Sequence, residues 1–450
     1  MNRRIGQLGI GIMVVILAGL AVHTPTTIWL GTFVSSGVDV MLKAWKEVLL
    51  LALIPVVQLI LLRDRPLFEK LARDPLFWVI KGYVLLHVLL MVVLWLGWWQ
   101  SIAGMMIDLR YILAFVLVYV LVAALPQARK WFLGAIAAGA VVIIGFASLQ
   151  HVLPIDVLKH IGYGPDTVTP YLTVDRNYDF VRINSTMRGP NPLGAYAASV
   201  VLIIVALIAT RELRGKKQLT GAGVMSTASL LALWSSYSRS AKLALAAGLV
   251  MIAWVTKPWQ YLSRKVLVGA SVAGVVGLVV AAVTIPQTTF FSNVFLHTNP
   301  EGGSSTQSNE EHWRSLQLGI ERMIDQPIGA GIGSTGSASL FGDNPVIIEN
   351  QFLFIAHELG WLGLVLFVVL LGMILWRLYV QATRGDGLAL GVFASGVGLV
   401  VVGLVLPVYV DDVVSIIWWS LAAIVLGGTV ETSAKKAPRK SKSQETSKRA

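Results

Sequence analysis

Apolar runs of about 20 residues recur along the whole chain, and they limit the possible folds more than any other feature. A helix of about 20 apolar residues crosses the ~30 Å hydrocarbon core of a bilayer. Charged residues make up only 13% of the chain, and hydrophobic residues make up 56%. A soluble domain of this length carries roughly twice that share of charge. The sequence therefore predicts an all-α polytopic membrane protein.

The apolar runs predict about 12 transmembrane helices. We expect them near residues 7–23, 47–62, 77–98, 105–125, 131–150, 193–210, 219–235, 240–256, 266–284, 352–376, 388–407 and 413–429. These helices would form one transmembrane domain over residues 1–430. Residues 431–450 are basic and of low complexity, and we expect them to be a disordered tail.

The distribution of positive charge predicts the orientation in the membrane. When the N-terminus is placed in the cytoplasm, most of the 36 Lys and Arg residues fall in cytoplasmic loops and in the tail. This is the arrangement that the positive-inside rule describes. We therefore expect both termini in the cytoplasm. The net charge of +12 then reflects topology and contact with anionic lipid, and it does not indicate a nucleic-acid partner.

Two of the loops on the opposite side are long, at residues 151–192 and 285–351. Loops of this length in a compact protein usually carry function or are disordered. The second loop is expected to contain an amphipathic helix that covers the bundle or lies on the membrane surface. The apolar positions of this helix are Trp313, Leu316, Ile320 and Met323. Ser308 and Glu311 form its predicted capping box, and Pro327 ends it.

A glycine-rich segment, "PIGAGIGSTGSASLFG", follows this helix. It lacks the lysine and the spacing of a nucleotide-phosphate loop. We expect its glycines to permit sharp turns or a close approach of the backbone to a ligand.

Few ionisable or amide side chains fall near the outer ends of the predicted spans. They are Arg110, Arg182, Arg188, Arg239, Lys242, Glu349 and Asn350. Arginine binds phosphate well because its guanidinium group stays charged and presents several donors. A nearby carboxylate can accept a proton from a hydroxyl group. The set predicts transfer from a lipid phosphate or diphosphate donor to a hydroxyl acceptor.

Structural roles compete with this interpretation at several positions. Arg110 lies close to Asp108 and is expected to form an ion pair, and Lys242 can extend to the interface. His357 and Glu358 lie deeper in the helix and are expected to be structural. The chain has no cysteine and no pair of histidines at metal-binding spacing. We therefore expect no metal site and no cofactor.

Four segments resemble the O-antigen ligase and O-antigen polymerase superfamily. "RINSTMRGPNPLGAY" is similar to the family stretch Arg-x-x-Gly-Thr-Phe-x-x-Pro-Asn-x-Leu, with Arg182 on the arginine and Asn191 on the asparagine. Ser185 stands where the family has glycine, and Arg188 falls on a variable position. "SSYSRSAKLAL" is similar to the family turn Ser-x-Ser-Arg and places Arg239 on its arginine.

The other two segments lie in and after the second long loop. "HWRSLQLGIERMIDQPIGAGIGS" resembles the family's amphipathic helix and its Pro-x-Gly-x-Gly stretch. The ligase motif His-[Asn/Ser/Gln]-x9-Gly-x-x-[Gly/Thr/Tyr] is matched in register by Asn350, Gly360 and Gly363. Glu349 stands where the ligases have histidine.

The resemblance implies a fold related to the C-type membrane glycosyltransferases and an activity in bacterial surface polysaccharide assembly. It implies a metal-independent transfer at the outer face of the bacterial cytoplasmic membrane, from a glycan on undecaprenyl diphosphate to a glycan, lipid or protein acceptor. Arg182 and Arg239 would hold the diphosphate, Glu349 would replace the family histidine as the base, and Asn350 would orient a sugar or the carboxylate. Asn191 would join the substrate-binding set through its match to the family asparagine, and Arg188, Arg110 and Lys242 are added to the set because they are predicted near the outer ends of the spans.

Several alternatives remain open from the sequence. A ligase and a polymerase share the same donor chemistry, and the Glu349 substitution leaves them equally supported. His312, on the predicted loop helix, is a second candidate for the base. A polytopic transporter or a lipid-linked glycan flippase is the alternative from another class. One cavity shared by Arg182, Arg239 and Glu349 would favour the transferase, whereas scattered positions would favour neither class.

Overall fold

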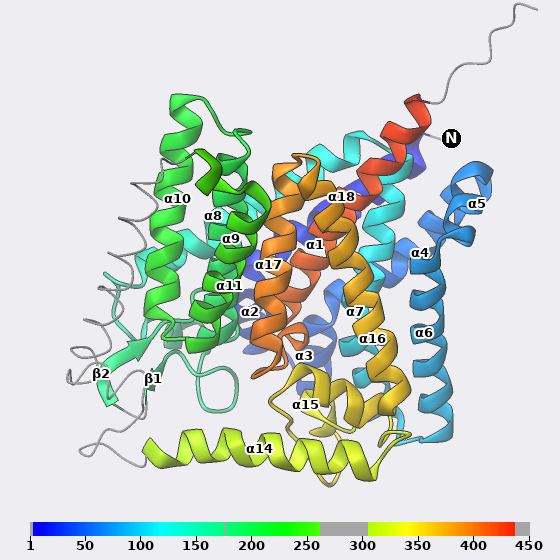
Figure 1. The fold of residues 1–450 in the computed structure, drawn as a ribbon. Helices are drawn as coiled ribbons and strands as arrows, with labels where there is room; N and C mark the ends of the chain where they lie inside the picture. The colour runs from blue at the N-terminus through cyan, green and yellow to red at the C-terminus, as the bar shows by residue number, and fades with distance from the viewer. Residues whose placement is uncertain (1–2, 175–176, 262–304, 437–450) are drawn as a thin grey trace, which may run out of the picture.

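The computed structural model describes residues 3–174, 177–261 and 305–436 (Figure 1). In this part of the chain, nine helices are long and apolar enough to cross a membrane. They are α1 (Arg3–Gly19) with its continuation through α2 (His23–Gly31), α4 (Trp45–Arg63), α6 (Pro75–Val93), α7 (Trp98–Ala124), α8 (Gln127–Leu149), α9 (Pro190–Ala209), α11 (Arg239–Thr256), α16 (Gln351–Thr383) and α18 (Asp412–Lys436). The predicted all-α polytopic fold is confirmed.

The remaining three predicted spans differ from these nine. α10 (Lys216–Ser235) occupies its predicted place, but it is too rich in Gly, Ser and Thr to count among the nine. α17 (Gly387–Gly403) is apolar and only 17 residues long. The predicted span 266–284 lies outside the described residues. The number 12 therefore stays a prediction.

The shorter elements connect these helices. They are α3 (Ser36–Lys43), α5 (Arg65–Arg73), α14 (Ser305–Asp325), α15 (Gly336–Ser339), the strands β1 (Leu172–Val174) and β2 (Asn177–Arg182), and 3₁₀ turns at Leu20–Val22, Val157–Ile161, Pro258–Tyr261 and Val408–Val410.

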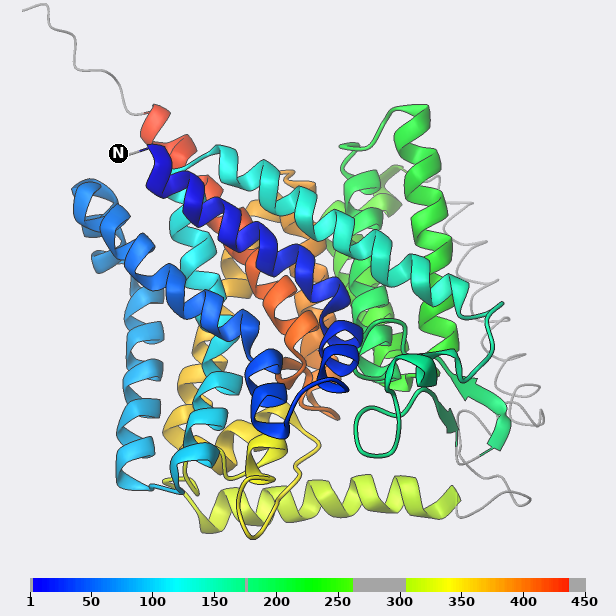
Figure 2. The same ribbon diagram turned by 180° about the vertical axis from the view of Figure 1, so that it is seen from behind.

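α18 forms the centre of the bundle and packs along α7. It is apolar on all sides, which is the pattern of a helix enclosed by others. Trp419 of α18 packs against Tyr111 and Phe115 of α7, with ring centroids 5.0 and 5.9 Å away. A second group, in which α9, α11 and α17 pack together, stands beside this centre (Figure 1). α1 and α8 cover the back of the molecule, side by side (Figure 2).

Buried ion pairs join the beginning of the chain to its last helix. Asp412 Oδ2, at the start of α18, lies 2.9 Å from Lys46 Nζ and 3.1 Å from His23 Nε2. Lys46 Nζ also lies 3.3 Å from Glu47 Oε2. A buried charge is costly unless it is paired in this way. The ion pairs therefore fix α2 and α4 against the start of α18.

The two ends of the described chain lie at one end of the bundle, and α14 lies across the opposite end (Figures 1 and 2). We call this opposite end the α14 face. It also carries α15 and the antiparallel hairpin of β1 and β2, in which Leu172 pairs with Arg182. The described parts of both predicted long loops therefore share one face. That this face is the outer one remains a prediction from the charge distribution.

α16 is interrupted at Gly360, whose φ of 66° and ψ of −168° are not helical. The glycine-rich segment enters this interruption. Ala330 N donates to His357 O at 2.6 Å, and Trp361 N donates to Pro327 O at 2.9 Å. The carboxylate of Glu358 accepts from the amides of Gly333 and Thr335 at 3.1 and 3.3 Å. The glycines thus provide turns and let the backbone of the segment approach α16 closely. The hydrogen bonds to Glu358 fix the glycine-rich segment against α16.

Candidate functional site

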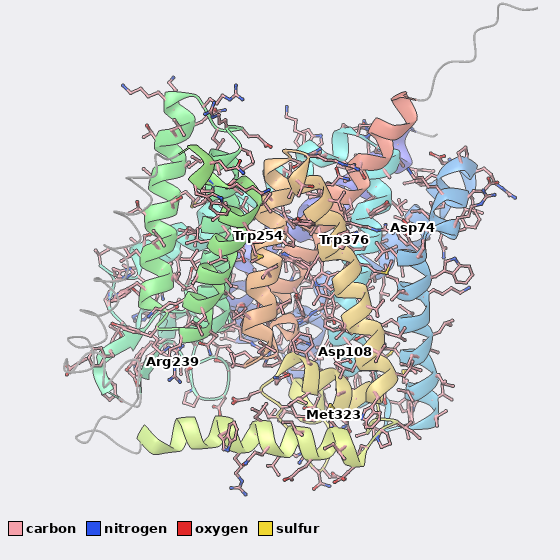
Figure 3. The ribbon with its side chains drawn as sticks, in the orientation of Figure 1. Asp74, Asp108, Arg239, Trp254, Met323 and Trp376 are labelled. Carbon is pink, nitrogen blue, oxygen red and sulfur yellow. The ribbon has the colours of Figure 1, made fainter. Side chains whose placement is uncertain are left out.

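A cavity of about 510 Å³ opens on the α14 face of the bundle. Four predicted site residues line it together: Arg182, Asn191, Arg239 and Glu349. The rest of its wall is mostly aromatic and aliphatic and includes Val174, Tyr237, Ser240, Leu243, Trp313, Leu316 and residues 404–406. Figure 3 shows Arg239 at the end of α11 that faces α14.

Arg182 is the last residue of β2, and its guanidinium group connects three segments. Its Nε donates to Ser236 O at 2.8 Å, in the turn between α10 and α11. Its terminal nitrogen donates to Asn191 Oδ1 at 2.6 Å, in the first turn of α9. Ile183 N also donates to Ser235 O at 3.2 Å. The hairpin therefore holds Arg182 in a fixed orientation at the cavity wall.

Arg239 is the first residue of α11, directly after the helix cap. Ser238 caps the helix through its hydroxyl, which accepts from Ala241 N at 3.4 Å. Gly194 of α9 lies against this turn, and a Cβ there would come within 2.7 Å of Ser236 Oγ and 2.9 Å of Ala241 Cβ. The missing side chain lets α9 approach closely, so Asn191 and Arg239 line the same cavity.

Glu349 enters the cavity wall from the segment between α15 and α16. Its backbone amide donates to Ser315 Oγ of α14 at 3.4 Å. The next residue, Asn350, is the N-cap of α16: its Oδ1 accepts from Phe352 N at 2.9 Å and from Leu353 N at 3.0 Å. Asn350 Nδ2 donates to Leu404 O at 2.7 Å. Both Oδ1 and Nδ2 of Asn350 are thus hydrogen-bonded within the protein, and Asn350 is not among the residues that line the cavity. It fixes the segment that carries Glu349.

Three helices begin at the cavity. Asn191 lies in the first turn of α9, Arg239 begins α11, and Glu349 directly precedes the cap of α16. The amides in the first turn of a helix carry partial positive charge and favour anions. Two guanidinium groups add full charges, against one carboxylate. The cavity is therefore suited to a ligand of more than one negative charge.

Arg188, Arg110 and Lys242 are not among the residues that line the cavity. Arg188 is exposed, and its charge acts on Asp411. Burial and the charge of Asp412 raise the pKa of Asp411, and Arg188 opposes that increase. The half-buried Lys242 places Nζ 4.8 Å from the ring centroid of Trp234 and 5.8 Å from that of Tyr237. Lys242 thus contacts Tyr237, which lines the cavity, and does not line the cavity itself.

The ion pair predicted for Arg110 exists, but the predicted partner is wrong. Arg110 is buried and lies 3.2 Å from Glu47 Oε1, and it also donates to Val410 O. Asp108 Oδ2 instead lies 4.0 Å from His87 Nε2 of α6. Residues two apart on a helix project in different directions, so Asp108 and Arg110 face different neighbours.

Tyr237, Trp313 and residues 404–406 line the cavity but are not among the site residues predicted from the sequence. Tyr237 adopts a φ of 50°, which is unusual for a residue with a side chain, and burial raises its pKa. Its position inside "SSYSRSAK" was the available signal. Trp313 was recognised only as an apolar position of an amphipathic helix. Residues 404–406 follow α17 and carry no local signal.

In the described ranges, no group of three or more His, Cys, Asp or Glu residues could hold a metal ion. The charged, amide and hydroxyl side chains at the cavity are those of two arginines, an asparagine, a glutamate, a serine and a tyrosine. This set can bind an anion and accept a proton.

The fold and the cavity define a polytopic helical membrane protein with a cationic site at one end of its bundle. Residues 224–368 match a family model described as O-antigen ligase. The match supports membership of the O-antigen ligase and polymerase superfamily, and with it an O-antigen ligase-like membrane glycosyltransferase function. The matched range contains Arg239, Glu349 and α14, whereas Arg182 and Asn191 precede it. None of the curated proteins compared with the chain matches it.

Proposed function

We propose that this protein transfers a glycan from undecaprenyl diphosphate to a hydroxyl acceptor at the outer face of the bacterial cytoplasmic membrane. One observation carries the proposal. Arg182, Arg239 and Glu349 come from three segments that are far apart in the sequence, and they line one cavity with Asn191. This shared cavity is the arrangement that favours a transferase over a flippase.

The arginines would bind the diphosphate of the donor. When the bond between the sugar and the phosphate breaks, negative charge grows on the departing oxygen. Arg182 is oriented by Ser236 and Asn191 before any ligand binds, so it needs little reorganisation during the reaction. Oriented donors of this kind typically contribute a factor of about 10²–10³ to the rate.

Glu349 would act on the acceptor. The acceptor hydroxyl oxygen forms a bond to the anomeric carbon, and the bond from that carbon to the phosphate oxygen breaks. The hydroxyl proton passes to the Glu349 carboxylate, and undecaprenyl diphosphate leaves with the bonding electrons. A positioned base typically contributes about 10²–10⁴ to the rate.

The aliphatic part of the wall suits a donor that carries a lipid chain. Leu243, Leu316 and residues 404–406 line the same cavity as the charged groups. A site with apolar walls and few polar groups excludes water and strengthens the electrostatic interactions inside it. The acceptor sugar would lie between this wall and the rings of Tyr237 and Trp313.

The test is a transfer assay with the full chain reconstituted in nanodiscs with a glycan on undecaprenyl diphosphate. The released undecaprenyl diphosphate and the length of the product are measured. A ladder of products indicates a polymerase, and a single addition indicates a ligase. A flippase would release no diphosphate. Arg239→Ala is compared with Arg314→Ala, because Arg314 is exposed on α14 and is not among the lining residues. Equal rates for these two variants would contradict the proposed role of Arg239.

A further inference from the structure

α14 exposes a row of large apolar side chains on the α14 face. Trp313 is 61% exposed and Ile324 is 58% exposed, and Ile320 between them is also exposed. Positions 313, 320 and 324 are spaced by seven and four residues, which keeps them on one side of a helix. Ile328, 67% exposed, follows just beyond the end of the helix. We call these four residues the apolar row.

The apolar row is separate from both other sides of α14. The side that packs on the bundle contains Leu316, Gly319 and Met323, and Gly319 lies against Leu353 of α16. The water-accessible polar side contains Glu321 and Asp325. The helix therefore has a buried side, a polar side and an exposed apolar side between them. An exposed apolar side of this length needs a partner.

The apolar row is continuous with the surface of the bundle that faces lipid. Trp361 Nε1 of α16 donates to Met323 O of α14 at 2.6 Å. Trp361 begins a row of exposed apolar residues on α16 that continues through Leu362 and Val365. α16 is among the nine helices that can span the membrane. Ile324, the residue after Met323, thus lies where the lipid-facing side of α16 begins.

Aromatic residues at the turn between α6 and α7 lie on the same face. Trp95, Trp98 and Trp99 are all exposed there. The neighbouring Gln100 donates to Gly333 O at 3.0 Å and so joins this turn to the segment that follows α14. Exposed tryptophans gather at the boundary between hydrocarbon and water. They indicate that α14 lies at the depth of this boundary.

We propose that the apolar row of α14 docks into the headgroup region of the lipid bilayer. The lipid surface is its partner. α14 then lies in the membrane surface, with its polar side toward water and its buried side on the bundle. Because Trp313 also lines the cavity, the row leads from the bilayer to the site. A lipid-linked donor therefore enters the cavity sideways from the membrane; this last step rests on the proposed function.

The docking is tested by the depth of single cysteines. The chain has no cysteine of its own, so Ile324→Cys and Glu321→Cys each carry one bimane label. Each full-length variant is placed in nanodiscs with ordinary or brominated lipids. We expect brominated lipid to reduce the emission at position 324 and not at 321, and aqueous iodide to do the reverse. Quenching of position 324 by iodide alone would overturn the docking, as would protection from both quenchers, because another part of the protein would then cover the row.

Donor entry is tested separately with Ile320→Ser combined with Ile324→Ser. We expect a higher KM for the long-chain donor in the bilayer and an unchanged KM for a short-chain, water-soluble diphosphate donor. An unchanged KM for both donors would overturn the entry route. Absence of transfer by the unaltered protein with either donor would contradict the proposed function and leave the depth measurement valid.

Discussion

Gly360→Ala is expected to destabilise the protein and to disturb the cavity. The φ of 66° and ψ of −168° at Gly360 fall in a region that is almost restricted to glycine, and holding another residue there costs about 1–3 kcal/mol. An added Cβ would also lie 2.2 Å from Pro327 O and 2.5 Å from Ile328 C. Such overpacking costs about another 1–3 kcal/mol. The sum is a large part of a typical folding free energy of about 5–15 kcal/mol.

Gly372→Ala is the matched control in the same helix, because a Cβ at Gly372 meets nothing within 4 Å. Thermal unfolding of the two variants in detergent is followed by tryptophan fluorescence, and glycan transfer is measured in parallel. We expect a Tm several degrees lower for Gly360→Ala, with reduced transfer, and a Tm for Gly372→Ala close to that of the unaltered protein. Equal Tm values for the two variants would refute the reasoning that the interruption of α16 requires glycine.

Three further predictions concern other parts of the structure. Glu349→Gln should lower kcat by about 10²–10⁴ without lowering the Tm, since it removes a base and keeps the shape of the side chain; unchanged kcat in the transfer assay would exclude Glu349 as the base. Asn350→Ala should cost about 1–2 kcal/mol through the lost cap of α16, and Asn350→Asp, which keeps the cap, should recover part of the lost Tm. Asp74 binds Arg377 through two hydrogen bonds of 2.7 and 2.5 Å. Burial alone would raise the pKa of Asp74, but the hydrogen bonds from Arg377 and Leu76 outweigh it and lower that pKa. The stability from this pair is therefore present above the unfolded pKa of about 3.9 and is lost as the pH falls through the folded pKa. Asp74→Asn should reduce the folding free energy by about 1 kcal/mol at neutral pH, seen as a lower Tm, and should change the Tm little in strong acid. An equal loss of Tm at both pH values would contradict this.

The spanning helices could be predicted because their apolar residues continue for the thickness of a bilayer. The hairpin was missed, although Tyr178, Phe180 and Arg182 alternate along β2 with the period of a strand. The cap of α16 was also readable, since an asparagine directly before an apolar run is an N-cap signal. That signal at Asn350 was overlooked in favour of a binding role.

The candidate site was predictable only in part. The motifs selected Arg182, Arg239 and Glu349, and these do line one cavity. The aliphatic wall from residues 404–406 could not be predicted, because it depends on how α17 packs beside α16. The partner of Arg110 could not be read from nearby sequence either, because Glu47 lies 63 positions away and meets it only through the packing of α4 on α7.

The pairing of Asp412 with Lys46 and His23 has a consequence for the biosynthesis of the protein. An unpaired carboxylate at the start of a spanning helix is costly in the membrane, so we expect α18 to pack stably only when the two cationic partners of Asp412 are in place. α2 and α4, which are synthesised early, therefore provide the charged partners against which α18, the last helix, packs. The stretch that matches the family model, residues 224–368, contains neither end of this connection. A recombinant fragment limited to that stretch would lack both His23 and Lys46 and their partner Asp412.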